Sequence, residues 1–246
     1  MILVCFLSFR RAEYLAQTVN AFIQHNQALL GTTLKMIALD QCTLQDTVAV
    51  FKDQRRHFEK VYTTTENHGI GWGFSQLVEL SRIYRADFIL YLEDDWLCQL
   101  PLEKHLQGIL QLFRTRPDVG TTRLRTMEDA VATVNHATAQ PVQTERWQES
   151  FLIGNYHYVF NPHLVRMEVA RSMIPVSSEH HAQLCYHALG LQAAQLADTM
   201  FVHIGQHRAP GRISRVPAPR PVLSCEWVAQ AKEFVVALPI KEVAGR

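Results

Sequence analysis

The stretch ADFILYLEDDWL, residues 86–97, decides the fold. Its apolar run, 86–92, has the length and composition of a strand that is buried on both faces, and it leads directly into Glu93, Asp94 and Asp95. Adjacent carboxylates repel one another, so this arrangement is costly unless a cation compensates their charge. Oxygen ligands of this kind suit Mg²⁺ or Mn²⁺, which can bridge carboxylate and diphosphate oxygens. The alternative is a solvated acidic turn or a helix N-cap.

Strand-like and helical segments alternate before this stretch. The strand-like runs are 2–8, 34–39 and 59–64, and the helical patterns are 11–25, 43–54 and 72–84. Strands separated by helices of this length imply right-handed crossovers and a parallel sheet covered on both faces. We therefore predict an α/β fold with a mostly parallel central sheet, whose ligand crevice lies at the carboxyl ends of the strands.

The pattern changes after residue 95, where strands and helices no longer alternate regularly. The segments expected there are a helix over 101–114, β-rich stretches within 119–160 with the clearest strand at 151–160, helices over 163–172 and 179–195, a short strand at 200–204 and a terminal helix over about 224–237. The sequence contains no internal repeat and no strong linker. We therefore predict one domain over residues 1–246, with a mixed second half.

Composition excludes several classes of protein. The 246 residues include 24 Lys and Arg against 23 Asp and Glu, and this near-neutral balance argues against a general nucleic-acid binder. No apolar run approaches the roughly 18 residues of a membrane helix, and the opening MILVCFLSF precedes its arginines, which favours a strand over a secretory signal. The five scattered cysteines fit reduced thiols. We expect a cytoplasmic protein with no integral membrane segment, with peripheral contact to a membrane surface as the alternative.

Polar residues follow each of the earlier strands. Ser8 and Arg10 follow the first strand, Asp40 ends the second, and TENHGIGWGF follows the third. Arg10 can neutralise a diphosphate, Asp40 can accept a hydrogen bond from a base or a ribose hydroxyl, and the glycines of GIGWG let the backbone approach a ligand. The glycine spacing is a near miss to the dinucleotide fingerprint and follows the wrong strand, so we reject a dinucleotide site.

Taken in order, these motifs resemble those of the nucleotide-sugar-dependent glycosyltransferases of GT-A fold, particularly the large family-2 group. That pattern is a first strand followed by R-x-x-x-L, a strand ending in Asp, an N-x-G loop, and a strand followed by a D-x-D-type acidic motif. The resemblance covers about residues 2–116 well and the remainder more loosely, and EDDWLCQLPLEKHL is also similar to the animal N-acetylglucosaminyltransferases of that fold. It implies a nucleotide-diphosphate sugar donor, Mn²⁺ or Mg²⁺, a hexosyl or N-acetylhexosaminyl group, and a glycan, lipid-linked or protein acceptor.

The resemblance also implies roles for individual residues. It makes Asp95 and His203 metal ligands and Glu179 the general base, with a donor site formed by Ser8, Arg10, Asp40, Asn67, Gly69, Glu93 and Asp94. The family's helix opens with an acidic pair, whereas Ser178 precedes Glu179 in this chain and two histidines follow it. A plain acid in the first turn of an amphipathic helix is the alternative for Glu179.

A basic segment, residues 206–221, follows His203. It carries Arg208, Arg212, Arg215 and Arg220 and no acid. Such a segment is placed to close over a diphosphate, so we predict that Arg208 and Arg212 contact the donor; a solvated basic loop is the alternative. By this interpretation residues 1–100 form the nucleotide-sugar-binding half, 101–205 the acceptor half, and 206–246 the basic loop and terminal helix.

The sequence therefore predicts a metal-dependent glycosyltransferase that inverts the anomeric centre, although it leaves a retaining outcome open. Two alternatives remain. A sugar nucleotidyltransferase would carry a glycine-rich loop after the first strand, where this chain has SFRRAEYL. A non-catalytic sugar-nucleotide-binding protein of the same fold is left open by Ser178 and the two histidines.

Overall fold

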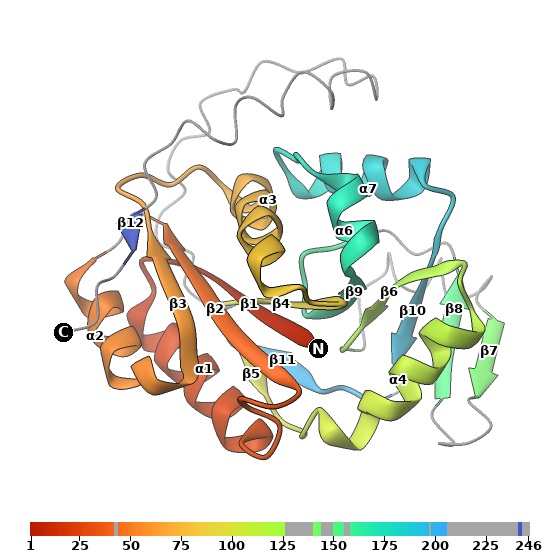
Figure 1. Ribbon diagram of the computed structural model, residues 1–246, viewed down its shortest axis with the longest axis horizontal. Helices are drawn as coiled ribbons and strands as arrows, with labels where there is room; N and C mark the ends of the chain where they lie inside the picture. Colours follow the sequence, from red (N-terminus) through yellow and green to blue (C-terminus); the bar gives the residue numbers. More distant parts are fainter. Residues whose placement is uncertain are drawn as a thin grey trace.

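The computed structural model describes residues 1–41, 44–125, 140–143, 150–154, 158–196, 198–205 and 241–242. Within these residues, ten strands form one sheet between two layers of helices (Figure 1). The strands of this sheet are β1 (Ile2–Phe9), β2 (Leu34–Gln41), β3 (Phe58–Thr63), β4 (Phe88–Glu93), β6 (Val119–Arg123), β7 (Gln140–Gln143), β8 (Ser150–Gly154), β9 (His163–Arg166), β10 (Gln192–Leu196) and β12 (Lys241–Glu242).

The order of strands across the sheet is β12-β3-β2-β1-β4-β9-β6-β10-β8-β7. Strands β3, β2, β1 and β4 run parallel to one another. Strand β9 is antiparallel to both of its neighbours, β4 and β6, so β6 and its parallel partner β10 point in the same direction as β4. A separate two-stranded sheet pairs β5 (Trp96–Cys98) with β11 (Phe201–His203). The expected mostly parallel α/β fold is confirmed.

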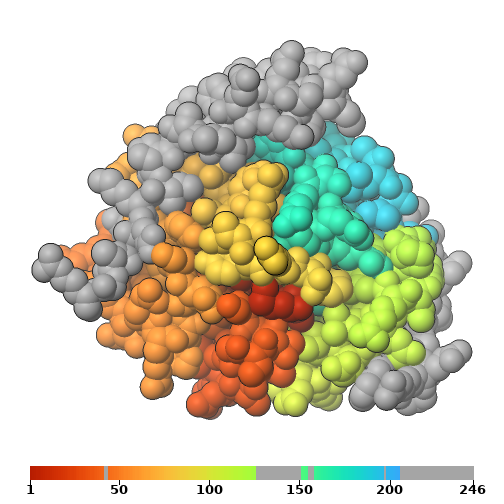
Figure 2. Space-filling model, in the orientation of Figure 1, coloured from red at the N-terminus to blue at the C-terminus, as the bar shows by residue number. Residues whose placement is uncertain are grey.

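Helices cover both faces of the central sheet. They are α1 (Ala12–Asn26), α2 (Gln45–Asp53), α3 (Ile70–Leu80), α4 (Glu103–Thr115), α6 (Met167–Met173) and α7 (Glu179–Ala188). Alternate residues of β1 point to opposite faces, so Phe6 belongs to a hydrophobic cluster with side chains of α1, α2 and α4, whereas Leu7 belongs to a second cluster with side chains of α3, α6 and α7. The latter three helices lie side by side (Figures 1 and 2). The sheet therefore has a hydrophobic core on each face.

Two glycines of GIGWG serve this packing. A Cβ atom at Gly71 would lie 2.3 Å from the backbone nitrogen of Ser178, and one at Gly73 would lie 2.5 Å from the Leu7 side chain. Both glycines therefore let α3 approach the protein itself, not a ligand as the sequence suggested. Gly69 differs, because its φ of +86° favours glycine and no atom of the described residues lies within 4 Å of a Cβ built there.

The structure corrects two predicted helices in the second half. Residues 163–166 form β9, and α7 ends at Ala188 so that residues 192–196 form β10. Alanine and glutamine favour helices, but Gly190 adopts a positive φ of 67° and redirects the chain, and Ala193 and Ala194 are then fully buried in the sheet. Strand pairing outweighs helix propensity at these positions. The predicted helix at 224–237 lies outside the described residues.

None of the helices that the structure describes is long and apolar enough to cross a membrane.

Candidate active site

The carboxyl ends of the parallel strands gather the predicted polar residues at one edge of the sheet. The register pairs Ser8 of β1 with Asp40 of β2, and Leu7 of β1 with Glu93 of β4. Asp94 and Asp95 follow Glu93 at this edge, in the turn between β4 and β5. We call residues 93–95 the acidic turn.

Asp94 fixes the acidic turn to the segment that joins β1 to α1. Its Oδ1 atom forms an ion pair with the guanidinium of Arg11, and its Oδ2 atom accepts a hydrogen bond from the backbone N–H of Phe9 at 2.9 Å. Its backbone carbonyl accepts a further bond from the Thr18 hydroxyl at 2.9 Å. Asp94 is 1% exposed. Both of its carboxylate oxygens therefore have partners within the protein.

Asp95 is held differently, and one of its oxygens has no partner among the residues that the structure describes. Its Oδ2 atom pairs with Arg11 and accepts a hydrogen bond from Nε2 of His203 at 3.1 Å. Its Oδ1 atom is buried and accepts no hydrogen bond from any residue that the structure describes. A Cβ atom at Gly205 would lie 2.2 Å from Oδ2, so only glycine lets the chain after β11 pass this carboxylate. A buried carboxylate oxygen without a donor is costly and requires an explanation.

Burial and neighbouring charges give the three carboxyl groups of the acidic turn different pKa values. Burial, together with the charges of Asp95 and Asp94, raises the pKa of Glu93 well above its usual range. Burial also raises the pKa of Asp94, to about 7, although Arg11 and the Phe9 N–H oppose this. For Asp95, burial is outweighed by the hydrogen bond from His203 and by the charge of Arg11, which lower its pKa. The negative charge is therefore favoured most at Asp95.

The acidic turn can be tested for its fit to a divalent cation. Among the described residues, no group of three His, Cys, Asp or Glu side chains is placed to hold a metal ion. The partnerless Oδ1 atom of Asp95 nevertheless suits Mg²⁺ or Mn²⁺, because Mg²⁺ commonly takes one or two carboxylates and completes its shell with diphosphate and water oxygens. His203 donates to Asp95 through Nε2, so this nitrogen would have to exchange that bond to become the predicted ligand.

The carboxylate of Asp40 is buried, and each of its oxygens accepts a hydrogen bond from a hydroxyl. It accepts hydrogen bonds from the hydroxyls of Ser8 at 2.6 Å and Thr47 at 2.7 Å, and it is 0% exposed. These contacts tie β1, β2 and α2 together. Asp40 is fully buried, whereas the Ser8 oxygen keeps acceptor positions after donating its proton, so the contact of these residues with a nucleotide stays a prediction.

The loop with Asn67 and Gly69 is positioned by Gln41, the last residue of β2. The Gln41 side chain accepts from the backbone N–H of His68 at 2.7 Å and donates to the carbonyl of Gly69 at 3.1 Å. Within the loop, Asn67 Oδ1 accepts from the N–H of Gly69 at 2.9 Å. The structure thus places this loop at the same edge of the sheet as the acidic turn.

Glu179 is the first residue of α7, which Ser178 caps by accepting from the N–H of His181 at 3.1 Å. Its Oε1 atom accepts from the backbone N–H of Phe160 at 2.9 Å, while Oε2 accepts none from the described residues. Tyr91 connects Glu179 with the acidic turn, because burial and then the charges of both raise the pKa of its hydroxyl. Glu179 and the first two residues of the acidic turn are therefore near enough to Tyr91 to act on the same hydroxyl.

Sequence reasoning selected Arg10 at the end of β1, but the structure places Arg11 against the carboxylates. Arg10 is exposed, with its guanidinium 5.6 Å from the ring of Phe9. The R-x-x-x-L spacing could have identified Arg11, since Leu15 lies four residues after it. Trp96 was also missed; its ring lies 4.7 Å from that of His203 and 4.6 Å from the guanidinium of Arg125. Arg208 and Arg212 lie outside the described residues.

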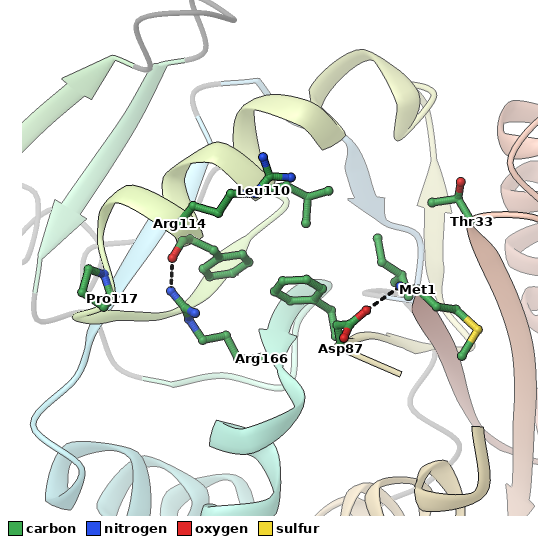
Figure 3. Close-up of a pocket in the computed structure, with 10 residues that line it drawn as sticks. Met1, Thr33, Asp87, Leu110, Arg114, Pro117 and Arg166 are labelled. Atoms are coloured by element: carbon green, nitrogen blue, oxygen red, sulfur yellow. Dashed lines mark hydrogen bonds and ion pairs between the residues drawn. The ribbon is translucent and has the colours of Figure 1, made fainter. Parts of the chain in front are cut away.

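A cavity of about 500 Å³ lies at the opposite edge of the sheet, where β1 and β4 begin (Figure 3). Phe88 and Phe113 stack in its wall, with ring centroids 5.3 Å apart. Arg166, which also lines it, donates to the backbone carbonyls of Phe113, Arg116 and Val119. Because this guanidinium already donates to backbone carbonyls at the end of α4, the cavity is a weaker candidate for a catalytic site than the acidic turn.

The sequence matches no family model and no curated protein, but the fold is similar to several solved structures. The mannosyltransferase PcManGT of Pyrobaculum calidifontis, solved with GDP-Man and Mn²⁺, has a TM-score of 0.60 at 12% identity over 85% of this chain and 58% of that one. TarS of S. aureus, solved with UDP, has a TM-score of 0.58 at 13% identity over 82% and 59%.

Glucosyl-3-phosphoglycerate synthase of Mycobacterium tuberculosis, solved with Mg²⁺ and UDP, has a TM-score of 0.56 at 13% identity over 82% of this chain and 71% of that one. This chain spans about three fifths of the length of the first two proteins. At these identities the similarity establishes the fold. The parallel sheet, the acidic turn at its carboxyl edge and these three structures together give one conclusion: the chain has the GT-A fold of the nucleotide-sugar-dependent glycosyltransferases.

Proposed function

We propose that this protein is a glycosyltransferase that moves a sugar from a nucleotide-diphosphate donor to an acceptor hydroxyl, with Mn²⁺ or Mg²⁺. The observation that carries the proposal is the buried Oδ1 atom of Asp95, which no described residue satisfies, at the edge where sheets of this kind bind ligands. The similar structures solved with UDP or GDP-Man, and in two cases with Mn²⁺ or Mg²⁺, support this proposal.

In the proposed mechanism the acidic turn would hold the cation, whose charge would let the donor diphosphate approach the carboxylates. Asp95 is the main metal-binding group, with His203 beside it, and Asp94 keeps the turn after β1 in place through Phe9, Arg11 and Thr18. A bound divalent cation acts as a Lewis acid that stabilises the charge of the departing nucleoside diphosphate. The loop at Asn67 and Gly69 lies at the same edge and is a candidate for contacts with the nucleotide.

Glu179 is the proposed general base. The hydrogen bond from Phe160 orients its carboxylate and leaves Oε2 to accept the proton of the acceptor hydroxyl. That hydroxyl then attacks the anomeric carbon from the face opposite the departing diphosphate, which inverts the configuration. The acceptor is a glycan, a lipid-linked sugar or a protein, and the sugar is a hexosyl or N-acetylhexosaminyl group.

The test is a panel of UDP- and GDP-sugars with candidate acceptors, in Mn²⁺, Mg²⁺ or EDTA. Release of UDP or GDP that requires both acceptor and metal supports the proposal, and the anomer of the product decides between inversion and retention. Tight donor binding without release under any condition supports the non-catalytic alternative. Absence of donor binding in the presence of either metal contradicts the proposal altogether.

A further inference from the structure

The carboxylates of the acidic turn are already paired with a cation of the protein itself, the guanidinium of Arg11. Arg11 directs Nη2 to Oδ1 of Asp94 and Nη1 to Oδ2 of Asp95, so one guanidinium bridges two carboxylates. The carboxylates are nearly buried, with side chains 1% and 5% exposed, while Arg11 is 24% exposed. Bidentate, charge-assisted contacts of this kind are among the strongest hydrogen bonds in proteins.

This bridge occupies atoms that a divalent cation would use. With Arg11 in place, both oxygens of Asp94 and the Oδ2 atom of Asp95 have partners, and only Oδ1 of Asp95 has none among the described residues. A divalent cation at Oδ1 would also lie on the same carboxylate as the guanidinium, and two cations at this spacing in a buried site repel each other strongly. Arg11 and the metal therefore oppose each other unless an anion separates them.

We propose that Arg11 is a resident counter-ion that moves from the acidic turn to the diphosphate when metal and nucleotide bind. The proposal rests on the metal-dependent use of a nucleotide-diphosphate donor. The planar guanidinium pairs with phosphate oxygens as well as with carboxylates, and its partial exposure at the turn before α1 gives it access to solvent. Metal alone then binds weakly, because it must displace Arg11, whereas metal with diphosphate binds cooperatively.

The test measures the dissociation constant of Mn²⁺ by electron paramagnetic resonance of the free ion, on the full chain. We expect Arg11→Met to tighten binding of Mn²⁺ alone at least about tenfold, because the competing cation is gone. Adding UDP or GDP should tighten Mn²⁺ binding by wild type much more than by Arg11→Met, after correction for Mn²⁺ held by free nucleotide. Arg10→Met is the matched control, which removes a positive charge at the neighbouring position, and it should change the Mn²⁺ affinity less than threefold.

Arg11→Met leaves two buried carboxylates without their cation and could unfold the chain, so Arg11→Lys is the second variant. Lysine keeps the charge but lacks the planar fork that bridges both carboxylates, and we expect an intermediate gain in Mn²⁺ affinity. Unchanged or weaker Mn²⁺ binding by folded Arg11 variants overturns the inference. So does wild type that binds Mn²⁺ equally well with and without nucleotide. The first of these results leaves the proposed activity intact, whereas the second also argues against metal-dependent use of the donor. Tighter Mn²⁺ binding by the variants, together with no turnover of sugar nucleotides by wild type, removes the activity and keeps the competition.

Discussion

The two edges of the central sheet each hold an arginine beside acidic and aromatic side chains, yet they differ in how completely their polar groups are satisfied. At the edge where β1 and β4 begin, Arg166 donates to three backbone carbonyls and lies 5.0 Å from the ring of Phe113 (Figure 3). At the carboxyl edge, Arg11 bridges two carboxylates while Oδ1 of Asp95 stays without a donor among the described residues.

This difference separates stability from function. Arg166 donates hydrogen bonds to backbone carbonyls at and after the end of α4. Its edge of the sheet therefore contributes to the stability of the fold. The acidic turn concentrates three carboxyl groups beside one guanidinium, the His203 imidazole and the Phe9 N–H, and it therefore gains more from an added ligand than it contributes to the folded chain alone. We expect substitutions at the two edges to affect different measurements.

The largest expected effect is that of Glu179→Gln on transfer. Loss of the base should lower the transfer rate by about 10²–10⁴-fold, since this is what a positioned proton acceptor contributes. The donor affinity should change little, because in the proposed mechanism Glu179 acts on the acceptor hydroxyl and not on the diphosphate. Steady-state kinetics and calorimetry with the donor measure the two quantities.

Glu168→Gln is the matched control, because Glu168 lies in the first turn of α6 as Glu179 does in α7, with its side chain 76% exposed. This control should keep the full transfer rate. A Glu179→Gln enzyme with a near-normal rate would show that the base lies elsewhere, with His180 as the next candidate.

Asp95→Asn should come next in size. It removes the carboxylate charge that favours a divalent cation, so metal-stimulated turnover should fall by about 10²–10³-fold, as when one electrostatic group of an active site is lost. The fold should persist. Asp87→Asn makes the same chemical change at the opposite edge and should leave turnover unchanged. Unaltered Mn²⁺ dependence in Asp95→Asn would rule out the metal assignment.

A third prediction concerns His163 of β9, which lies opposite Tyr91 of β4, two residues before the acidic turn. Its Nδ1 atom donates to the carbonyl of Asn161 and its Nε2 atom accepts from the Tyr158 hydroxyl, both at 2.6 Å. Burial lowers its pKa from 6.5 to about 4. The stability that neutral His163 contributes is therefore present above pH 6.5 and is lost as the pH falls through this window.

The measurable quantity is the difference in unfolding free energy between wild type and His163→Gln. It should change by up to about 3 kcal/mol between these two pH values, because each pKa unit corresponds to about 1.4 kcal/mol. Thr122→Val replaces a buried side chain that does not titrate, so it serves as the control and should give a difference that is flat with pH. A flat difference for His163→Gln as well would mean that this imidazole titrates normally in the folded chain.

The smallest effect is expected at the opposite edge. Arg166→Met should lower the unfolding free energy by about 2 kcal/mol, because backbone carbonyls near the end of α4 lose their donor. Arg114→Met, at an exposed position in the same cavity wall, should stay within about 0.5 kcal/mol of wild type. Neither variant should alter Mn²⁺ or donor binding measured under native conditions. A change in either affinity would show that the two edges are coupled.

The sequence predicted those features that short stretches of chain encode. Alternating strand and helix periods located β1 to β4, and the apolar run before Glu93 placed the acidic turn at a strand end. The first-turn position of Glu179 in α7 also followed from local pattern. Local pattern was insufficient at β9 and β10, where the same residues could form either a helix or a strand. The strands that pair with them come from distant parts of the sequence, which a short stretch of chain does not include.

The partners inside the site were decided only by the tertiary structure. Asp95 meets Arg11 from 84 positions earlier and His203 from 108 positions later, and Gln41 holds a loop 28 positions further on. The sequence by itself determined that acids stand at the end of a buried strand. Strand register and the path of the chain after β11 past Gly205 decide which of two adjacent arginines faces these acids. They also decide which oxygen has no donor among the described residues. These arrangements arise only when distant segments pack together, because local propensity does not fix the distances between their atoms.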